Sequence, residues 1–261
     1  MKNDRLKSIL GIPYFLFLVI FVVCPVLILL YYAFTNGAGE FSLANFTLFF
    51  TDSKAIGTLI YSAMVAVVTT IVCLLIAYPV AYLLAKGEFR RGNVLLMLFV
   101  MPMWINFTLR ITALKEILTL IEGNLAFHPF LNTVIGMTYD FLPFMILPIY
   151  NTIAKIDHSY IEAAKDLGAK SYRVFLRVIL PLSIPGIISG ITMVFLPSMT
   201  NYVVLDMMYN STYIMGSLVG SYFSMYDWNN GSVISMILLI LILLLSTITG
   251  EFSDKEDYAY E

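Results

Sequence analysis

The chain has 261 residues, of which 60% are hydrophobic and only 12% charged, and its formal net charge is −2. A charged fraction about half that of soluble domains indicates one membrane-embedded domain and leaves no room for a second, soluble domain. The net charge gives no sign of a nucleic-acid partner, so none is expected. Cys24 and Cys73 lie inside apolar runs, which favours neither a disulfide framework nor a metal cluster.

Long charge-free runs predict an all-α polytopic membrane protein with six transmembrane helices. We expect the spans at about 12–34, 58–84, 94–114, 130–154, 182–205 and 232–249, all within a single transmembrane domain covering residues 1–261. Pro25 should kink the first span, and Pro102 should interrupt the third.

Basic residues indicate the orientation of these spans. They gather in the N-terminal segment (Lys2, Arg5, Lys7), in the loop after the second span (Lys86, Arg90, Arg91) and in the interval 155–181. Because basic loops stay on the cytoplasmic side, both termini are expected in the cytoplasm. Arg110 falls on the opposite side and is expected to anchor the outer interface.

The interval 155–181 is polar and should form a helix–turn–helix on the membrane surface. A first helix is expected over 160–167, and Gly168 can end it by adopting a left-handed conformation. Ser171 can cap a second short helix. The two helices should present an apolar side to a soluble partner, formed by Ile161, Ala164, Leu167 and Phe175.

The spacing within this interval is specific. Glu162-Ala163-Ala164 is followed three residues later by Gly168, and nine further residues lead to Val178-Ile179-Leu180-Pro181. The pattern resembles the EAA-x3-G-x9-I-x-L-P motif of ABC-importer permeases, with Val178 in place of isoleucine. The alternative is an ordinary amphipathic cytosolic loop.

That resemblance implies a type I importer permease of the MetI-like fold, multi-pass in a bacterial cytoplasmic (inner) membrane. In the family the loop is a coupling helix that docks on the ATPase subunit. By resemblance the ATPase-coupling residues here are Glu162, Ala163, Ala164, Leu167 and Gly168. The implied partners are an ATPase dimer, a second homologous permease, an extracytoplasmic substrate-binding protein and membrane lipid.

The chain lacks the GxxxxGK[ST] phosphate loop, so ATP and Mg²⁺ are expected in the partner ATPase. We therefore expect no catalytic residue, no cofactor and no enzymatic activity in this chain. His128 and His158 have no companions at ligand spacing, so no metal site is expected.

Further segments resemble the permeases of spermidine/putrescine importers: PMWINFTLRI (102–111), FLPFMILPIY (141–150) and the region around 180–208. A polyamine path needs negative charge and aromatic faces, which stabilise ammonium groups. The candidate path residues are Trp104, Tyr139, Asp140, Tyr202 and Asp206.

Each candidate has an alternative role. Asp140 can instead belong to a buried pair, with Arg110 or with a residue of a partner subunit. Asp206 can be a solvated residue at a helix end, and Trp104 an interfacial or packing aromatic. Tyrosines at such positions more often pack than bind.

Other functions stay open at this point. The cargo of an importer permease can be another small solute, of anion, metal or amino-acid type. A secondary transporter driven by an ion gradient is less favoured, because it does not need the EAA spacing and usually contains inverted repeats. A membrane-embedded protease is disfavoured, because no HExxH sequence and no Ser/His pair lies in the spans.

Overall fold

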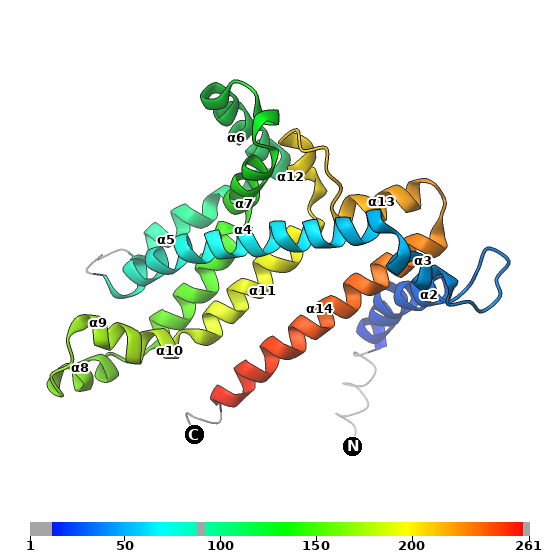
Figure 1. The fold of residues 1–261 in the computed structure, drawn as a ribbon. Coiled ribbons are helices and arrows are strands. Elements are labelled where there is room, and N and C mark those ends of the chain that lie inside the picture. The colour runs from blue at the N-terminus through cyan, green and yellow to red at the C-terminus, as the bar shows by residue number, and fades with distance from the viewer. Residues whose placement is uncertain (1–11, 88–91, 258–261) are drawn as a thin grey trace, which may run out of the picture. The chain divides into compact units, whose positions relative to one another are not determined.

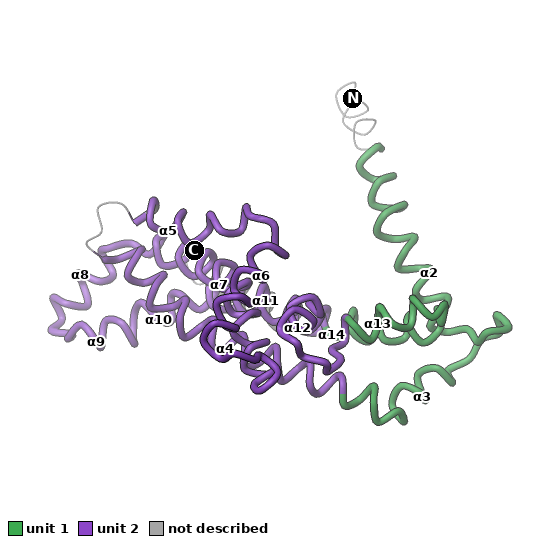
Figure 2. The backbone as a smooth tube through the Cα atoms, turned by 90° about the horizontal axis from the view of Figure 1, so that it is seen from above, with its two compact units in different colours: residues 1–57, 217–241 green, residues 58–216, 242–261 purple. Residues whose placement is uncertain are grey.

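The computed structural model describes residues 12–87 and 92–257, which are helical almost throughout (Figure 1). In these ranges, four helices are long and apolar enough to cross a membrane, or up to six if each of two bent pairs is one span. Lys2, Arg5, Lys7, Arg90 and Arg91, on which the predicted orientation depends, lie outside them. The chain divides into two compact units (Figure 2).

Unit 1 (residues 1–57 and 217–241) contains the first apolar helix, Ile12–Ala33, which ends in α2 (Cys24–Ala33). It also contains α3 (Ala44–Thr51), most of α13 (Met215–Ser224) and the first part of α14 (Trp228–Asp257). Two carboxamides join these elements: Asn229 and Asn45 both donate to the carbonyl of Thr35, at 2.6 and 2.8 Å. The end of α2 is thereby held beside the starts of α3 and α14.

Unit 2 (residues 58–216 and 242–261) is built on most of α4 (Ser53–Lys86), on α7 (Pro129–Lys155) and on α11 (Ile184–Thr200). Helices α7 and α11 pack closely because α11 presents Gly186 and Gly190 to α7. A Cβ on Gly186 would lie 2.6 Å from Thr152 Oγ1, and one on Gly190 would lie 2.6 Å from Met145 Sδ. This small-xxx-small pattern lets two membrane helices approach at backbone distance.

Two π-helical turns precede prolines. The first, η1 (Val19–Val23), ends two residues before Pro25, and the second, η4 (Phe175–Ile179), ends two residues before Pro181. A proline within a helix lacks an N–H group and collides with the carbonyl four residues earlier. A π turn widens the helix at that carbonyl, so the kink expected at Pro25 is accommodated by a bulge rather than by a break.

The third expected span, 94–114, is not one continuous helix. It consists of α5 (Gly92–Val100), the 3₁₀ turn η2 (Met101–Trp104) and α6 (Phe107–Glu122), with a bend of 99°. Pro102 lies in the 3₁₀ turn where the span is interrupted, as expected, and Asn106 caps α6 after the break by accepting from the Thr108 N–H at 2.9 Å. After α6, a 3₁₀ turn η3 (Leu125–Phe127) leads into α7.

The fifth expected span, 182–205, is also interrupted. The helical segment 171–182 and α11 meet at Ser183 with a bend of 60°, and α11 ends at Thr200. A separate short helix follows, α12 (Tyr202–Met207). Pro185, in the first turn of α11, and Pro197 near its end have no N–H to continue the hydrogen-bond ladder.

Candidate functional site: a surface knob and a membrane path

The interval between α7 and α11 folds into a small helical knob (residues 157–182), seen at one end of unit 2 in Figure 2. Its first helix is α8 (His158–Asp166), two residues longer at its start than expected. Asp157 is the N-cap, and its carboxylate accepts from the Ser159 N–H at 2.9 Å. Hydrogen bonds from the backbone and the side chain of Ser159 hold the pKa of Asp157 below its ordinary value, so the capping carboxylate is ionised at neutral pH.

Gly168 ends α8 as expected, with φ = +76°. The Gly168 N–H bonds to the Lys165 carbonyl at 2.8 Å, and the Ala169 N–H bonds to the Ala164 carbonyl at 3.0 Å. This pair of bonds is a Schellman motif, which requires a left-handed residue at the position of Gly168. Gly168 therefore fixes the angle at which the chain leaves α8.

The second part of the knob comprises α9 (Ser171–Val174), η4 and α10 (Leu180–Leu182). The expected cap at Ser171 is wrong: Ser171 is the first helical residue, and Lys170, at the cap position, makes no side-chain cap bond. The segment is also longer than the short helix predicted, because it continues through η4 to Leu182.

Several residues expected to face a partner face their own chain instead. Ile161 is buried in the core of unit 2. Phe175 packs edge-on against Tyr78 and Tyr82 of α4, with ring centroids 5.7 and 5.5 Å apart. Lys86, the last residue of α4, donates to the Ile156 carbonyl at 2.7 Å. The knob is thus anchored to the end of α4 and does not hang as a free loop.

The opposite side of the knob is exposed. Leu167 is 89% exposed, and Glu162, Ala163 and Gly168 are exposed with it, whereas Ala164 is partly buried. Glu162 contacts His158, with Oε1 3.0 Å from Nδ1. Further exposed apolar side chains are Tyr160, Tyr172 and Leu176. The exposed side of the knob therefore carries apolar, acidic and basic groups, with Leu167 as its most exposed apolar side chain.

Asp140 of α7 and Arg110 of α6 form a buried ion pair. Arg110 Nη2 lies 2.6 Å from Asp140 Oδ1, and the two residues are 7% and 4% exposed. A buried pair with Arg110 was expected as an alternative to a role of Asp140 in the solute path. The expectation that Arg110 anchors an outer interface is wrong, because the break at Asn106 turns α6 so that Arg110 faces α7.

The other candidate path residues lie on the surface of unit 2. Trp104 is 84% exposed, and Tyr139, Tyr202 and Asp206 are also exposed. Helix α12, which carries Tyr202 and Asp206, packs against both α6 and α7. Within the described ranges, no hydrogen bond or ion pair joins these four side chains to one another, so the chain alone does not assemble them into a closed site.

Asn210 is a structural residue that the sequence did not indicate. It is 3% exposed, and its amide nitrogen donates to Tyr61 Oη and Thr133 Oγ1, both at 2.8 Å. Its amide oxygen accepts from the Thr212 N–H at 3.1 Å. Asn210 thus ties the segment after α12 to α4 and α7. An asparagine just after a short helix resembles any turn residue, so sequence carries no signal for this role.

The chain matches a known protein family over most of its length. Residues 74–253 match the family described as "Binding-protein-dependent transport system inner membrane component". This range includes the whole knob, the Arg110–Asp140 pair and all candidate path residues. The family expected from the EAA spacing is therefore confirmed.

Individual relatives agree. The chain is 35% identical to the spermidine/putrescine transport system permease protein PotB of Haemophilus influenzae, over 93% of this chain and 92% of the relative. It is 34% identical to PotB of Escherichia coli, over 78% of this chain and 80% of the relative.

Solved structures establish the fold. A bacterial ABC transporter involved in import of the acidic polysaccharide alginate matches with a TM-score of 0.77 at 13% identity, covering 97% of this chain and 96% of that one. The MetNI methionine ABC transporter matches with a TM-score of 0.57 at 17% identity, covering 77% of this chain and 97% of that one. The all-α, MetI-like fold predicted from the sequence is confirmed.

The knob carries the EAA spacing, several helices have membrane-spanning length, and the family match covers most of the chain. The chain therefore belongs to the family of inner membrane components of binding-protein-dependent transport systems, and it is a multi-pass membrane protein.

Proposed function

We propose that this chain is the permease subunit of an ATP-driven importer that carries polyamines of the spermidine/putrescine type. The observation that carries the proposal is the knob, because its exposed face holds the coupling motif while its inner face is fixed to α4. The polyamine cargo is supported by the named activity of relatives similar over nearly the whole chain.

The partners follow from this role. An ATPase dimer docks on the knob and binds ATP and Mg²⁺, a second homologous permease completes the path, and an extracytoplasmic binding protein delivers the solute. Movement of the docked ATPase acts on Leu167 and the Gly168 turn. The ring contacts of Phe175 and the hydrogen bond of Lys86 transmit this movement to α4. Closure of the ATPase dimer then rocks the spans between inward-open and outward-open states.

The solute path is proposed on the exposed residues of unit 2: Trp104, Tyr139, Tyr202 and Asp206. Their aromatic faces and the carboxylate suit ammonium groups. Asp140 contributes indirectly, because its pairing with Arg110 neutralises a positive charge that would repel a polycation. The path is completed only when the partner permease covers these side chains.

The test is uptake of labelled spermidine into proteoliposomes containing the complete transport complex, with ATP supplied on the knob side. ATP-dependent uptake is expected, and it should stop when the ATPase is inactivated. Uptake that survives this inactivation but collapses with the ion gradient would instead indicate a secondary transporter. Efficient uptake of an anion, a metal or an amino acid, with none of spermidine, would contradict the polyamine cargo.

Asp206→Asn should weaken spermidine uptake. It removes a carboxylate without changing side-chain size, and the Asp206 side chain is exposed, so folding should be little affected. The loss of one charge-assisted contact predicts a rise in KM of roughly 3- to 10-fold. Glu116→Gln, an exposed acid of α6, is the matched control. Unchanged uptake kinetics in Asp206→Asn would remove Asp206 from the path.

A further inference from the structure

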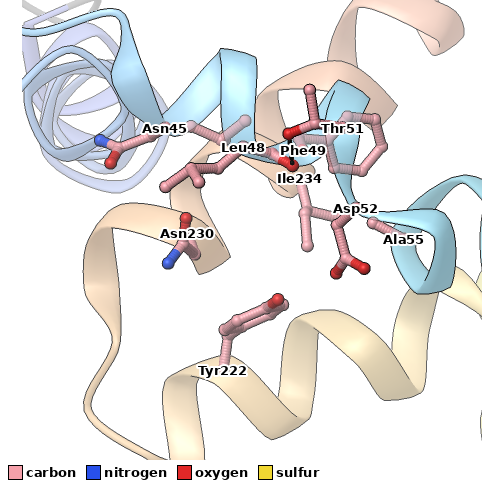
Figure 3. A pocket seen from close by; sticks show the side chains of 10 residues that line it. Asn45, Leu48, Phe49, Thr51, Asp52, Ala55, Tyr222, Asn230 and Ile234 are labelled. Atoms are coloured by element: carbon pink, nitrogen blue, oxygen red, sulfur yellow. Dashed lines mark hydrogen bonds between the residues drawn. The ribbon is translucent and has the colours of Figure 1, made fainter.

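Unit 1 contains a cavity of about 370 Å³ that is lined by none of the residues of the knob or of the candidate path (Figure 3). Its wall is formed by α3, the start of α4, α13 and the first turns of α14. Leu48 and Phe49 supply apolar surface, and Asp52, Tyr222 and Asn230 supply polar groups. This volume falls in the range of small-molecule sites, about 300–1,000 Å³.

Several hydrogen-bond donors in the cavity wall are already used. The amide nitrogen of Asn230 donates to Asp227 Oδ2 at 2.8 Å, and that of Asn45 donates to the Thr35 carbonyl at 2.8 Å. Thr51 Oγ1 donates to the Thr47 carbonyl at 2.8 Å. The acceptors left for a ligand are Asp52 Oδ2, the Tyr222 hydroxyl oxygen and the side-chain carbonyl oxygen of Asn230, which suit a ligand rich in N–H donors.

Asp52 is the charged group of the cavity. Its Oδ1 accepts from the Lys54 N–H at 2.9 Å and so caps α4, while its Oδ2 accepts from none of the described residues. Figure 3 shows the carboxylate pointing into the cavity, toward the hydroxyl end of Tyr222. Burial, and then the negative charges of Asp52 and Asp227, raise the pKa of Tyr222 above its ordinary value. The Asp52 carboxylate places a negative charge in the cavity wall, and this charge favours a cation.

The cavity lies at the start of α4, where it is lined by Asp52 and Ala55. Asp52 directly precedes α4, and Lys86 ends α4 beside the knob. Because a membrane-spanning helix has its two ends on opposite faces of the membrane, the Asp52 end of α4 and its Lys86 end are expected on opposite faces. In an importer whose Lys86 end of α4 is cytoplasmic, the Asp52 end is on the face from which the solute arrives.

We propose that this cavity binds one ammonium group of the incoming polyamine, as an accessory site separate from the path on unit 2. The inference rests on the proposed function. An ammonium group has three N–H donors and no acceptor, and the cavity offers the Asp52 carboxylate, the Tyr222 hydroxyl and the Asn230 carbonyl oxygen. The rings of Phe49 and Tyr222 add cation–π attraction.

The decisive variant is Asp52→Asn. Asparagine caps helices about as well as aspartate, so the bond to the Lys54 N–H is kept while the charge is lost. Initial rates of labelled spermidine uptake by the reconstituted complex should give a KM raised roughly 5- to 10-fold, with Vmax little changed. The matched control is Glu40→Gln, an exposed acid in the same segment that does not line the cavity.

Tyr222→Phe keeps the ring and removes the hydroxyl, and it should raise KM by a smaller factor. An unchanged KM in Asp52→Asn overturns the site. An equal rise in KM in Glu40→Gln also overturns it, because that result indicates a general attraction of cations to the surface. If Asp52→Asn does not accumulate in the membrane, Tyr222→Phe decides: a normal KM overturns the site.

Spermidine uptake by the wild-type complex distinguishes a failure of the proposed function from a failure of the accessory site alone. If it takes up no spermidine, the proposed function fails, and the site fails with it. If it takes up spermidine and Asp52→Asn behaves normally, only the accessory site fails.

Discussion

Replacing Gly168 with valine is expected to reduce ATP-driven uptake about 10-fold or more, while the amount of permease in the membrane stays normal. Gly168 has φ = +76°, where a β-branched residue is strained by roughly 1–2 kcal/mol. Relief of that strain reorients the turn after α8 and displaces Leu167, the most exposed apolar side chain of the knob. A Cβ at Gly168 would meet no atom within 4 Å, so the rest of the chain is not disturbed.

The matched control is Gly168→Asn, because asparagine tolerates the left-handed conformation. Uptake by the reconstituted complex and co-purification of the ATPase with this chain should both fall in Gly168→Val and be largely retained in Gly168→Asn. Normal uptake by Gly168→Val at normal abundance would show that the turn does not couple the ATPase to the membrane spans.

Removing one partner of the Arg110–Asp140 pair is expected to destabilise the permease by about 3–5 kcal/mol, because the remaining charge is buried without compensation. Arg110→Met leaves Asp140 alone between α6 and α7, and Asp140→Leu leaves Arg110 alone. The double variant Arg110→Met/Asp140→Leu should recover most of the loss, since buried ion pairs are often replaceable by apolar groups of similar volume.

Thermal unfolding of the purified permease in detergent measures this double-mutant cycle. Glu116→Gln, which removes an exposed charge from the same helix, should leave the unfolding midpoint unchanged. Single variants as stable as the wild type would contradict a structural role. So would a double variant no more stable than the less stable single variant.

Local sequence patterns predicted the parts of the site that depend on one short segment. Gly168 was expected to end α8, and it does, because a glycine after a helix is favoured by its own backbone freedom. The EAA spacing identified the family for a similar reason: the whole motif lies within one loop. The cap was missed at Asp157 and misplaced at Ser171, because Asp and Ser near a helix start are both plausible caps and only the backbone path selects one.

The sequence by itself determined the membrane class, the helical fold and the loop that carries the EAA spacing, because apolar run length, turn residues and motif spacing are properties of contiguous residues. Only the tertiary structure decided that Ile161 and Phe175 turn inward, because an apolar side chain does not specify whether its own chain or a partner will cover it. It also decided that Arg110 meets Asp140, and that Asp52 and Tyr222 share a cavity. These groups are far apart in the chain, and their encounter depends on helix breaks and packing that no single segment encodes.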